Sequence, residues 1–162
     1  MANQKASGYN VNYNDAIEMK GKFTMNLIER FIKPVSAHCD VPCGIYETDT
    51  MTHAAATVLR MTEKIEALEG ADQEKSDAHN NFIRMVMTKE KHAQLCKDQI
   101  YMLWSDYFKP EHLEKFPDLH ERMWHAAKQC GKVKQSISRE EAQKLVDMVH
   151  EISHMFADSK QA

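Results

Sequence analysis

Apolar residues recur every three or four positions over most of the chain, and this spacing predicts amphipathic helices rather than strands. Four such stretches are expected, over residues 50–69, 77–104, 117–130 and 138–158. The buried stripes are predicted to contain Val58, Leu59, Ile65 and Leu68, then Phe82, Val86, Ala93, Ile100 and Leu103, and finally Leu145, Val149, Ile152 and Phe156. Short links between four helices favour an all-α protein, with an antiparallel four-helix bundle over residues 47–162.

Local signals indicate where these helices begin and end. Thr50 or Thr52 can cap the first helix, and Gly70 is expected to end it. Gly131 is expected to end the third helix in the same way. The run Ser-Arg-Glu-Glu at residues 138–141 has the spacing of a capping box and should open the last helix.

The composition agrees with a helical globular domain and excludes some classes of function. The 162 residues suffice for one domain with a buried core, 43% of them are hydrophobic, and Gly and Pro are scarce. A net charge of −3 provides no basic face for nucleic acid. The four cysteines favour a metal site in a reducing compartment over a disulfide framework, so a cytoplasmic location is expected. Two of them, Cys96 and Cys130, fall inside expected helices and are interpreted as buried thiols.

The chemistry is concentrated in residues 38–46, directly before the first expected helix, which read His-Cys-Asp-Val-Pro-Cys-Gly-Ile-Tyr. The two cysteines, with a Pro and a Gly that favour a turn, form a hook that can close on one metal ion. Cys39 can offer its sulfur and its own amide nitrogen, and Cys43 can offer a second sulfur. Nitrogen and sulfur donors in a plane suit nickel(II) or copper(II) better than zinc, which prefers a tetrahedron.

Every specified position of this run matches the metal hook H-C-D-x-P-C-G-x-Y, so the chain resembles the nickel-dependent superoxide dismutases. The resemblance implies an enzyme that disproportionates superoxide to oxygen and hydrogen peroxide by cycling one nickel ion per subunit between nickel(II) and nickel(III). It also implies that His38, Cys39 and Cys43 bind the nickel, with the His38 ring as an axial ligand of the oxidised state. A cis Val41–Pro42 bond and a homohexamer of four-helix bundles are further implications.

Three donors in the metal plane come from Cys39 and Cys43, and the source of the fourth indicates that the chain is a precursor. The nitrogen of residue 38 can bind metal as a free α-amine, whose pKa is about 8, but it is a poor ligand as an amide inside a chain. His38 has 37 residues ahead of it. We therefore predict that a peptidase cuts between Ala37 and His38 and removes residues 1–37 as a leader, and that the uncut chain is inactive.

The predicted leader contains an amphipathic stretch over residues 14–33. Polar and charged residues interrupt its apolar positions, so it matches neither a secretory signal nor a membrane span. Residues 35–37, Val-Ser-Ala, have the small side chains of a processing site. A structural N-terminal helix that stays on the protein is the alternative, and an organellar targeting role is left open. The leader carries a net charge of +2 and the remainder −5, so an anionic substrate needs local positive charge near the metal.

A second run, residues 104–120, resembles the second signature of the same enzymes, W-S-D-Y-F-K-P followed by H-x-E-K-aromatic-P-x-L-H. Alone it would be interpreted as a helix end with aromatic anchors and two stiffening prolines, whose role is packing. Beside the hook, the resemblance implies that Tyr107 lies near Tyr46 where the substrate approaches. The side chains implied at this approach are Asp40, Tyr46 and Tyr107 for access and Lys109 and Lys115 for electrostatic guidance.

Two positions depart from the family pattern. In its best-described members, a glutamate on the first helix and an arginine on the second hold the axial imidazole. Ungapped counting places these positions at Ala54 and His92, so neither partner is present, and His53 is a candidate substitute. Such partners orient metal-bound imidazoles, so the axial bond and the turnover rate depend on what replaces them.

Two rival functions also follow from the sequence. The hook could be a zinc- or copper-binding module of a metal carrier. Separately, residues 150–154, His-Glu-Ile-Ser-His, match the H-E-x-x-H helix of zinc peptidases, with Asp158 the only later acid available as a third ligand. No sheet is expected that could form a substrate cleft, so His150 and His154 are interpreted as solvated. Four further histidines are interpreted as surface or packing residues: His79, His112, His120 and His125.

Overall fold

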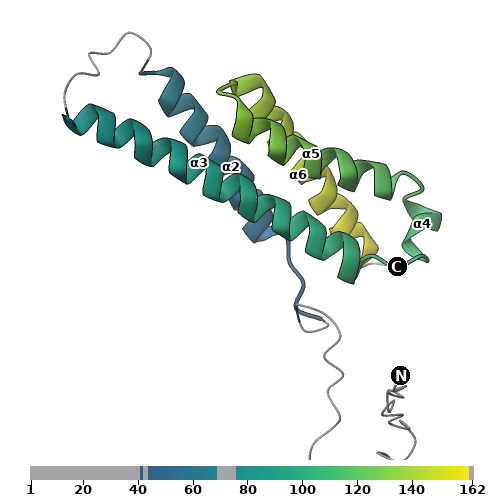
Figure 1. The fold of residues 1–162 in the computed structure, drawn as a ribbon. Helices are drawn as coiled ribbons and strands as arrows, with labels where there is room; N and C mark the ends of the chain where they lie inside the picture. The colour runs from purple at the N-terminus through teal and green to yellow at the C-terminus, as the bar shows by residue number, and fades with distance from the viewer. Residues whose placement is uncertain (1–40, 42–43, 69–75, 161–162) are drawn as a thin grey trace, which may run out of the picture. The chain divides into compact units, whose positions relative to one another are not determined.

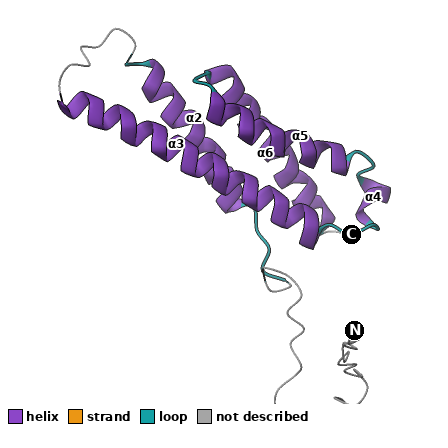
Figure 2. Ribbon diagram, viewed as in Figure 1, coloured by secondary structure: helices purple, strands orange, loops and turns teal. Residues whose placement is uncertain are grey.

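The computed structural model describes residues 41, 44–68 and 76–160. The chain divides between Ser36 and Ala37 into two units, and all described residues lie in the second. Their regular structure is helical only, without a strand (Figure 2). The elements are α2 (Asp49–Glu66), α3 (Ser76–Met102), the π-helical turn η1 (Leu103–Tyr107), α4 (His112–Lys115), α5 (Leu119–Gln135) and α6 (Arg139–Ser159).

The four long helices, α2, α3, α5 and α6, form one bundle. α2 packs against α3 and α6, and α5 packs against the same two helices (Figure 1). Buried side chains from all four helices meet in a single core, and this confirms the predicted all-α four-helix bundle. None of the helices described is long and apolar enough to cross a bilayer. Large side chains of the core include Met51, Val58, Ile100, Leu103, Leu119, Met123, Val133, Leu145, Val149 and Ile152.

The expected buried stripe of α3 is buried over only part of the helix. Phe82 and Val86 are half-buried, and the first fully buried side chain of α3 after them is Lys89. The physical reason is length, since α3 has 27 residues and α5, which packs against it, has 17. The N-terminal turns of α3 therefore have fewer partners than the periodicity of the sequence indicates.

The first helix, α2, is capped by a carboxylate, and the prediction of Thr50 or Thr52 as its cap is wrong. Glu47 accepts hydrogen bonds from the amide groups of Asp49 and Thr50, and the Thr50 hydroxyl donates to it at 2.6 Å. Slight burial raises the pKa of Glu47, but these hydrogen bonds outweigh the burial and hold the pKa below its usual value. Glu47, which directly follows the hook, thus provides the hydrogen-bond acceptor for the amide groups at the N-terminus of α2.

The third long helix, α5, continues for another turn past Gly131, so the predicted stop at this glycine is wrong. A glycine costs a helix interior only about 1 kcal/mol, and Val133, buried beyond it, continues the core stripe. The chain leaves the helix at Ser136, whose backbone is extended. The expected stop of α2 at Gly70 lies outside the described residues, and that helix ends at Glu66.

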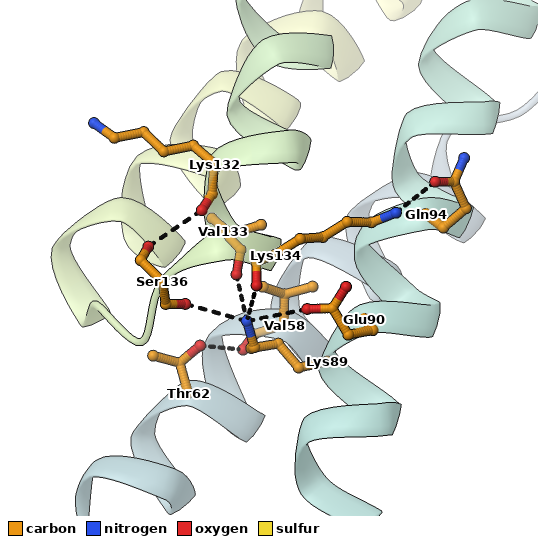
Figure 3. A network of polar contacts seen from close by, with 9 residues as sticks. All are labelled: Val58, Thr62, Lys89, Glu90, Gln94, Lys132, Val133, Lys134 and Ser136. Carbon is orange, nitrogen blue, oxygen red and sulfur yellow. Dashed lines mark hydrogen bonds and ion pairs between the residues drawn. The ribbon is translucent and has the colours of Figure 1, made fainter.

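A buried lysine on α3 satisfies the end of α5 (Figure 3). Lys89 is 2% exposed, and its Nζ donates hydrogen bonds to the carbonyl oxygens of Val133 at 2.5 Å, Lys134 at 3.1 Å and Ser136 at 3.1 Å. The last carbonyl groups of a helix have no partner within it, and a lysine ammonium has three N–H donors for these three acceptors. Lys89 therefore joins α3 to the end of α5.

The last helix, α6, begins at the predicted capping box, of which the first half is confirmed. Ser138 Oγ accepts a hydrogen bond from the amide of Glu141 at 3.3 Å. The Glu141 side chain accepts from Lys132 Nζ at 2.5 Å and from Gln129 Nε2 at 2.8 Å. The glutamate of the box thus ties α6 to α5.

Cys96 on α3 and Cys130 on α5 are buried free thiols, as predicted. A hydrogen bond with Cys130, followed by burial, raises the pKa of Cys96 far above its usual value. The folded protein therefore keeps the Cys96 proton at a pH where the unfolded chain loses it.

We expect this thiol to make the folded state less stable in alkali. Above about pH 8.5 the unfolded chain binds fewer protons than the folded one, so the free energy of unfolding falls by up to about 1.4 kcal/mol per pH unit from this group. The free energy of unfolding can be measured with urea at pH 8, 9 and 10. The slope of this free energy against pH should be shallower for Cys96→Ala than for the parent. Equal slopes would contradict the prediction.

Candidate metal centre

The structure describes the end of the hook, and its predicted ligands lie outside the described residues. Those outside are His38, Cys39, Asp40, Pro42 and Cys43, and with them the expected cis bond between Val41 and Pro42. Gly44 has φ of +96°, a left-handed conformation that glycine adopts without strain. A Cβ there would meet no atom within 4 Å, so the backbone angle is what requires glycine. The hook therefore ends in a left-handed turn.

Tyr46 anchors the end of the hook to the bundle. Its side chain is 6% exposed, whereas the neighbouring Ile45 is 64% exposed. Lys160, which caps the C-terminus of α6, donates from Nζ to the Tyr46 carbonyl oxygen at 3.2 Å. The ring of Tyr46 lies against that of Tyr107, with centroids 5.5 Å apart. The first signature is thus held by the second and by the end of α6.

The second signature begins in a π-helical turn. The amide of Phe108 donates to the carbonyl oxygen of Leu103 at 3.0 Å, a bond that spans one residue more than in an α-helix. Such turns are rare and occur often at functional sites. This turn places Tyr107 between rings of three different segments. Its ring centroid lies 4.6 Å from that of Phe156 and 5.7 Å from that of His112, which is nearly parallel to it at 12°.

A cavity of about 250 Å³ lies where these segments meet. It is lined by Gly44 and Tyr46 from the end of the hook and by Asp106, Tyr107, Lys109 and His112 from the second signature. Its volume is large enough to admit a diatomic anion together with water, and its lining includes one lysine and one carboxylate. The two runs that resemble the family signatures therefore form one cavity, next to the last cysteine of the hook in the sequence.

The two candidate guiding lysines differ in position. Lys109 lines the cavity, and its Nζ is 3.8 Å from the carboxylate of Glu111. Lys115 does not line the cavity; its Nζ donates to the carbonyl oxygen of Asp158 at 2.9 Å. Of the two, Lys109 is the better placed to act on an anion in the cavity.

A larger hollow of about 370 Å³ lies elsewhere, and its chemistry does not suggest a redox site. Arg122 there donates to Asp118 at 2.7 Å and to Glu151 at 2.8 Å, so the charges in it already pair with one another. None of residues 41 and 44–46 lines it. The smaller cavity, which the end of the hook lines, is therefore the candidate functional site.

The two positions that depart from the family pattern lie near each other. Ala54 is fully buried in α2, and its neighbour His53 is exposed. The rings of His53 and His92 have centroids 6.5 Å apart in an edge-to-face arrangement. His92 Nδ1 is 2.9 Å from the carbonyl oxygen of Thr88, which only accepts, so Nδ1 is the donor in this hydrogen bond. The structure thus places His92 beside His53, the candidate substitute, whose role toward the hook stays a prediction.

The peptidase-like run is exposed on α6. His150 and His154 face solvent, and Glu151 accepts a hydrogen bond from Arg122. Among the described residues, which include Asp158, no group of three or more His, Cys, Asp or Glu side chains could hold a metal ion. The interpretation of these histidines as solvated agrees with this arrangement.

The sequence did not point to several residues that line the cavity or contact its tyrosines. His112, interpreted only as surface or packing, both stacks on Tyr107 and accepts a hydrogen bond at Nδ1 from the Lys109 amide at 3.0 Å. Ser159 and Lys160 contact the two tyrosines from the end of α6. A serine and a lysine at a helix end carry no local signal, because helix ends are polar in most proteins.

The fold and the site define a helical metalloprotein in which a cysteine hook precedes the first helix of a four-helix bundle. The chain belongs to the family of nickel-containing superoxide dismutases, whose family model matches residues 33–160. It is 36% identical over 139 residues to the nickel superoxide dismutases of Streptomyces seoulensis and Streptomyces coelicolor. Each match covers 84% of this chain and 100% of the relative.

Solved structures of nickel superoxide dismutases agree with the fold. A native structure superposes with a TM-score of 0.65 at 34% identity, and one with nickel ligation of the oxidised state with a TM-score of 0.66 at 36% identity. Both matches cover 77% of this chain and 100% of the solved chain. The chain is therefore an oxidoreductase that acts on superoxide with nickel as its metal, and neither the metal carrier nor the zinc peptidase is supported.

Proposed function

We propose that the nickel site of this superoxide dismutase is formed by His38, Cys39 and Cys43 after a cut between Ala37 and His38. Two thiolates, an amide nitrogen and an α-amine are donors that suit nickel in a plane. When bound, nickel supplies the one-electron couple that dismutation needs. The observation that carries the proposal is the cavity lined by Gly44, at the end of the hook, and by Tyr107 of the second signature.

A comparison of lengths supports the cut. The 77% of this chain that matches the solved structures is about 125 of 162 residues, and residues 38–162 number 125. The 84% that matches the curated relatives is about 136 residues. The span matched to the solved chains thus has the size of a protein that begins at the hook, and the span matched to the curated relatives is longer.

The side chains around the cavity control access. Two superoxide anions and two protons become one oxygen and one hydrogen peroxide, so the site must admit a small anion and supply protons. Tyr46 and Tyr107 narrow the approach, and hydroxyl groups of this kind hold water that can deliver protons. Asp40, which lies outside the described residues, would complete the opening and disfavour larger anions.

The metal content of a chain that begins at His38 tests the proposed ligands. We expect one nickel ion per subunit and the rhombic electron spin resonance signal of nickel(III). Cys39→Ser and Cys43→Ser should each abolish both, because a hydroxyl is a poor substitute for a thiolate. Cys130→Ala, which removes a buried thiol from α5, is the matched control and should keep the nickel. Zinc or copper without the nickel(III) signal would contradict the proposal.

Lys109 is proposed to guide superoxide into the cavity. Removing one positive charge about 8 Å from the approaching anion costs about 0.5 kcal/mol in water, so Lys109→Ala should lower kcat/KM roughly twofold at low salt. The difference should shrink as salt screens the charge. Lys128→Ala, which removes an exposed lysine beside Trp124, is the control. Stopped-flow decay of superoxide at two ionic strengths measures both, and an effect independent of salt would contradict guidance.

The assembly, the location and the processing partner are proposed from the family resemblance. We expect a homohexamer of trimmed chains in the cytoplasm, formed after a leader-removing peptidase has acted. Lys115, bound to the end of α6, is proposed to add to the positive charge on that side of the cavity. Sedimentation of the trimmed protein tests the assembly, and a mass other than six copies would overturn it.

A further inference from the structure

Three oxygen atoms follow one another at hydrogen-bond distance at the end of α6. The Tyr107 hydroxyl oxygen is 2.7 Å from Ser159 Oγ, and Ser159 Oγ is 2.7 Å from the carbonyl oxygen of Phe156. Ser159 is 7% exposed, so water does not compete freely for its hydroxyl group. The direction of each hydrogen bond in this chain can be worked out by counting protons.

A carbonyl oxygen only accepts, and two oxygens 2.7 Å apart need a hydrogen between them. The single hydroxyl proton of Ser159 therefore goes to the Phe156 carbonyl. Ser159 Oγ then has only lone pairs to offer, so the Tyr107 hydroxyl is the donor in the bond between them. The proton of Tyr107 is thereby committed to α6.

We infer that Ser159 is a positioning residue that turns the proton of Tyr107 away from the cavity and leaves the phenol oxygen as an acceptor. A molecule that binds this oxygen must bring its own hydrogen. Water and hydrogen peroxide can do so, whereas superoxide, an anion without a proton, cannot. Tyr107 oriented in this way holds water and does not capture the substrate anion. The inference rests on the proposed role of Tyr107 at the substrate approach.

The ring of Tyr107 is fixed independently of Ser159. Phe156 and His112 pack against it, at centroid distances of 4.6 Å and 5.7 Å, and Tyr46 packs at 5.5 Å. Ser159→Ala therefore should leave the ring in place and release only the direction of the hydroxyl proton. That proton can then turn to an anion in the cavity.

The position of the proton is tested directly by neutron diffraction. The protein used is the metal-free chain that begins at His38, crystallised in heavy water. We expect deuterium on the Tyr107 oxygen, directed at Ser159 Oγ, and deuterium on Ser159 directed at the Phe156 carbonyl. Deuterium on Tyr107 directed away from Ser159 would overturn the inference. This measurement needs neither nickel nor turnover, so it decides the inference even if the proposed metal site fails.

Inhibition by azide, a small anion without a proton, tests the consequence. Ser159→Ala should lower the azide inhibition constant roughly tenfold, since one hydrogen bond to a charged group becomes available. Ser159→Thr keeps a hydroxyl and should restore the parent value. Ser153→Ala removes a hydroxyl from the same helix that bonds to Thr48 Oγ1 at 2.8 Å, and should change nothing.

The same substitution in a Tyr107→Phe background separates orientation from general disturbance of the site. Without the phenol hydroxyl, Ser159→Ala should have no further effect on azide inhibition. An unchanged constant in Ser159→Ala, or an equal change in both backgrounds, would overturn the inference, because neither result can come from the direction of the Tyr107 proton.

Discussion

A chain that begins at His38 will bind one nickel ion per subunit and remove superoxide, and the chain of 162 residues will do neither. The α-amine of His38 exists only after the cut, and it completes the in-plane donors that begin with the Cys39 amide. Even loss of a group that only orients a ligand lowers metal affinity about 10- to 100-fold, so loss of a ligand should lower it by about 100-fold or more. Nickel titration and stopped-flow decay of superoxide measure the two effects.

A chain that begins at Ala37 is the sharpest control for this prediction. It differs from the active form by one residue, so the bundle, the thiols and the net charge of the side chains are unchanged. Its α-amine is moved one residue from the position that closes a ring with the Cys39 amide. We expect it to fail as the full chain does. Equal nickel uptake by all three chains would show that the freed terminus has no part in the site.

The bundle could be predicted from the sequence because the burial of apolar side chains decides it. The apolar stripes of α2 and α6 are continuous, and burial of residues such as Val58, Leu145 and Ile152 outweighs local preferences. Helix ends were predicted less well, since they depend on neighbours that are distant in sequence. Gly131 does not stop α5 while Val133 beyond it is buried, and Glu47 caps α2 although threonines follow it.

The site, like the fold, has parts that could be predicted from the sequence and parts that could not. The hook and the second signature could be recognised because their chemistry is carried by residues adjacent in sequence. Ser159 and Lys160 could not be recognised, since their role depends on α6 ending beside Tyr46 and Tyr107. Both tyrosines are more than fifty residues away from them in the sequence. The packing of α6 against α2 and α5 brings these groups together.

Lys89 shows the limit of sequence reasoning most clearly. It lies in a charged stretch with Glu90 and Lys91, where the expected state of a lysine is full solvation. The structure buries it and gives its ammonium three carbonyl acceptors, with Glu90 at 3.4 Å. Helical spacing places Lys89 on the buried stripe, between Val86 and Ala93, and Lys91 off it. What the sequence does not show is how the ammonium is satisfied, because its acceptors come from residues 133–136 at the end of another helix.

Lys89→Met should therefore destabilise the bundle by about 3 kcal/mol, because the buried carbonyl groups lose their donors while the volume is nearly kept. With total stabilities of about 5–15 kcal/mol, such a loss is large and should lower Tm by roughly 10 °C. Lys89→Ala should lose somewhat more, since it also leaves a cavity. Urea and thermal unfolding followed by circular dichroism give both values.

Lys91→Met is the matched control, since Lys91 is exposed on the same helix two residues away. Its effect should stay within about 0.5 kcal/mol. Hydrogen exchange adds a local readout: the amides in the last turn of α5 should lose protection in Lys89→Met more than those of α2, because the released carbonyls belong to α5. If Lys89→Met and Lys91→Met unfold at the same urea concentration, Lys89 does not hold the end of α5.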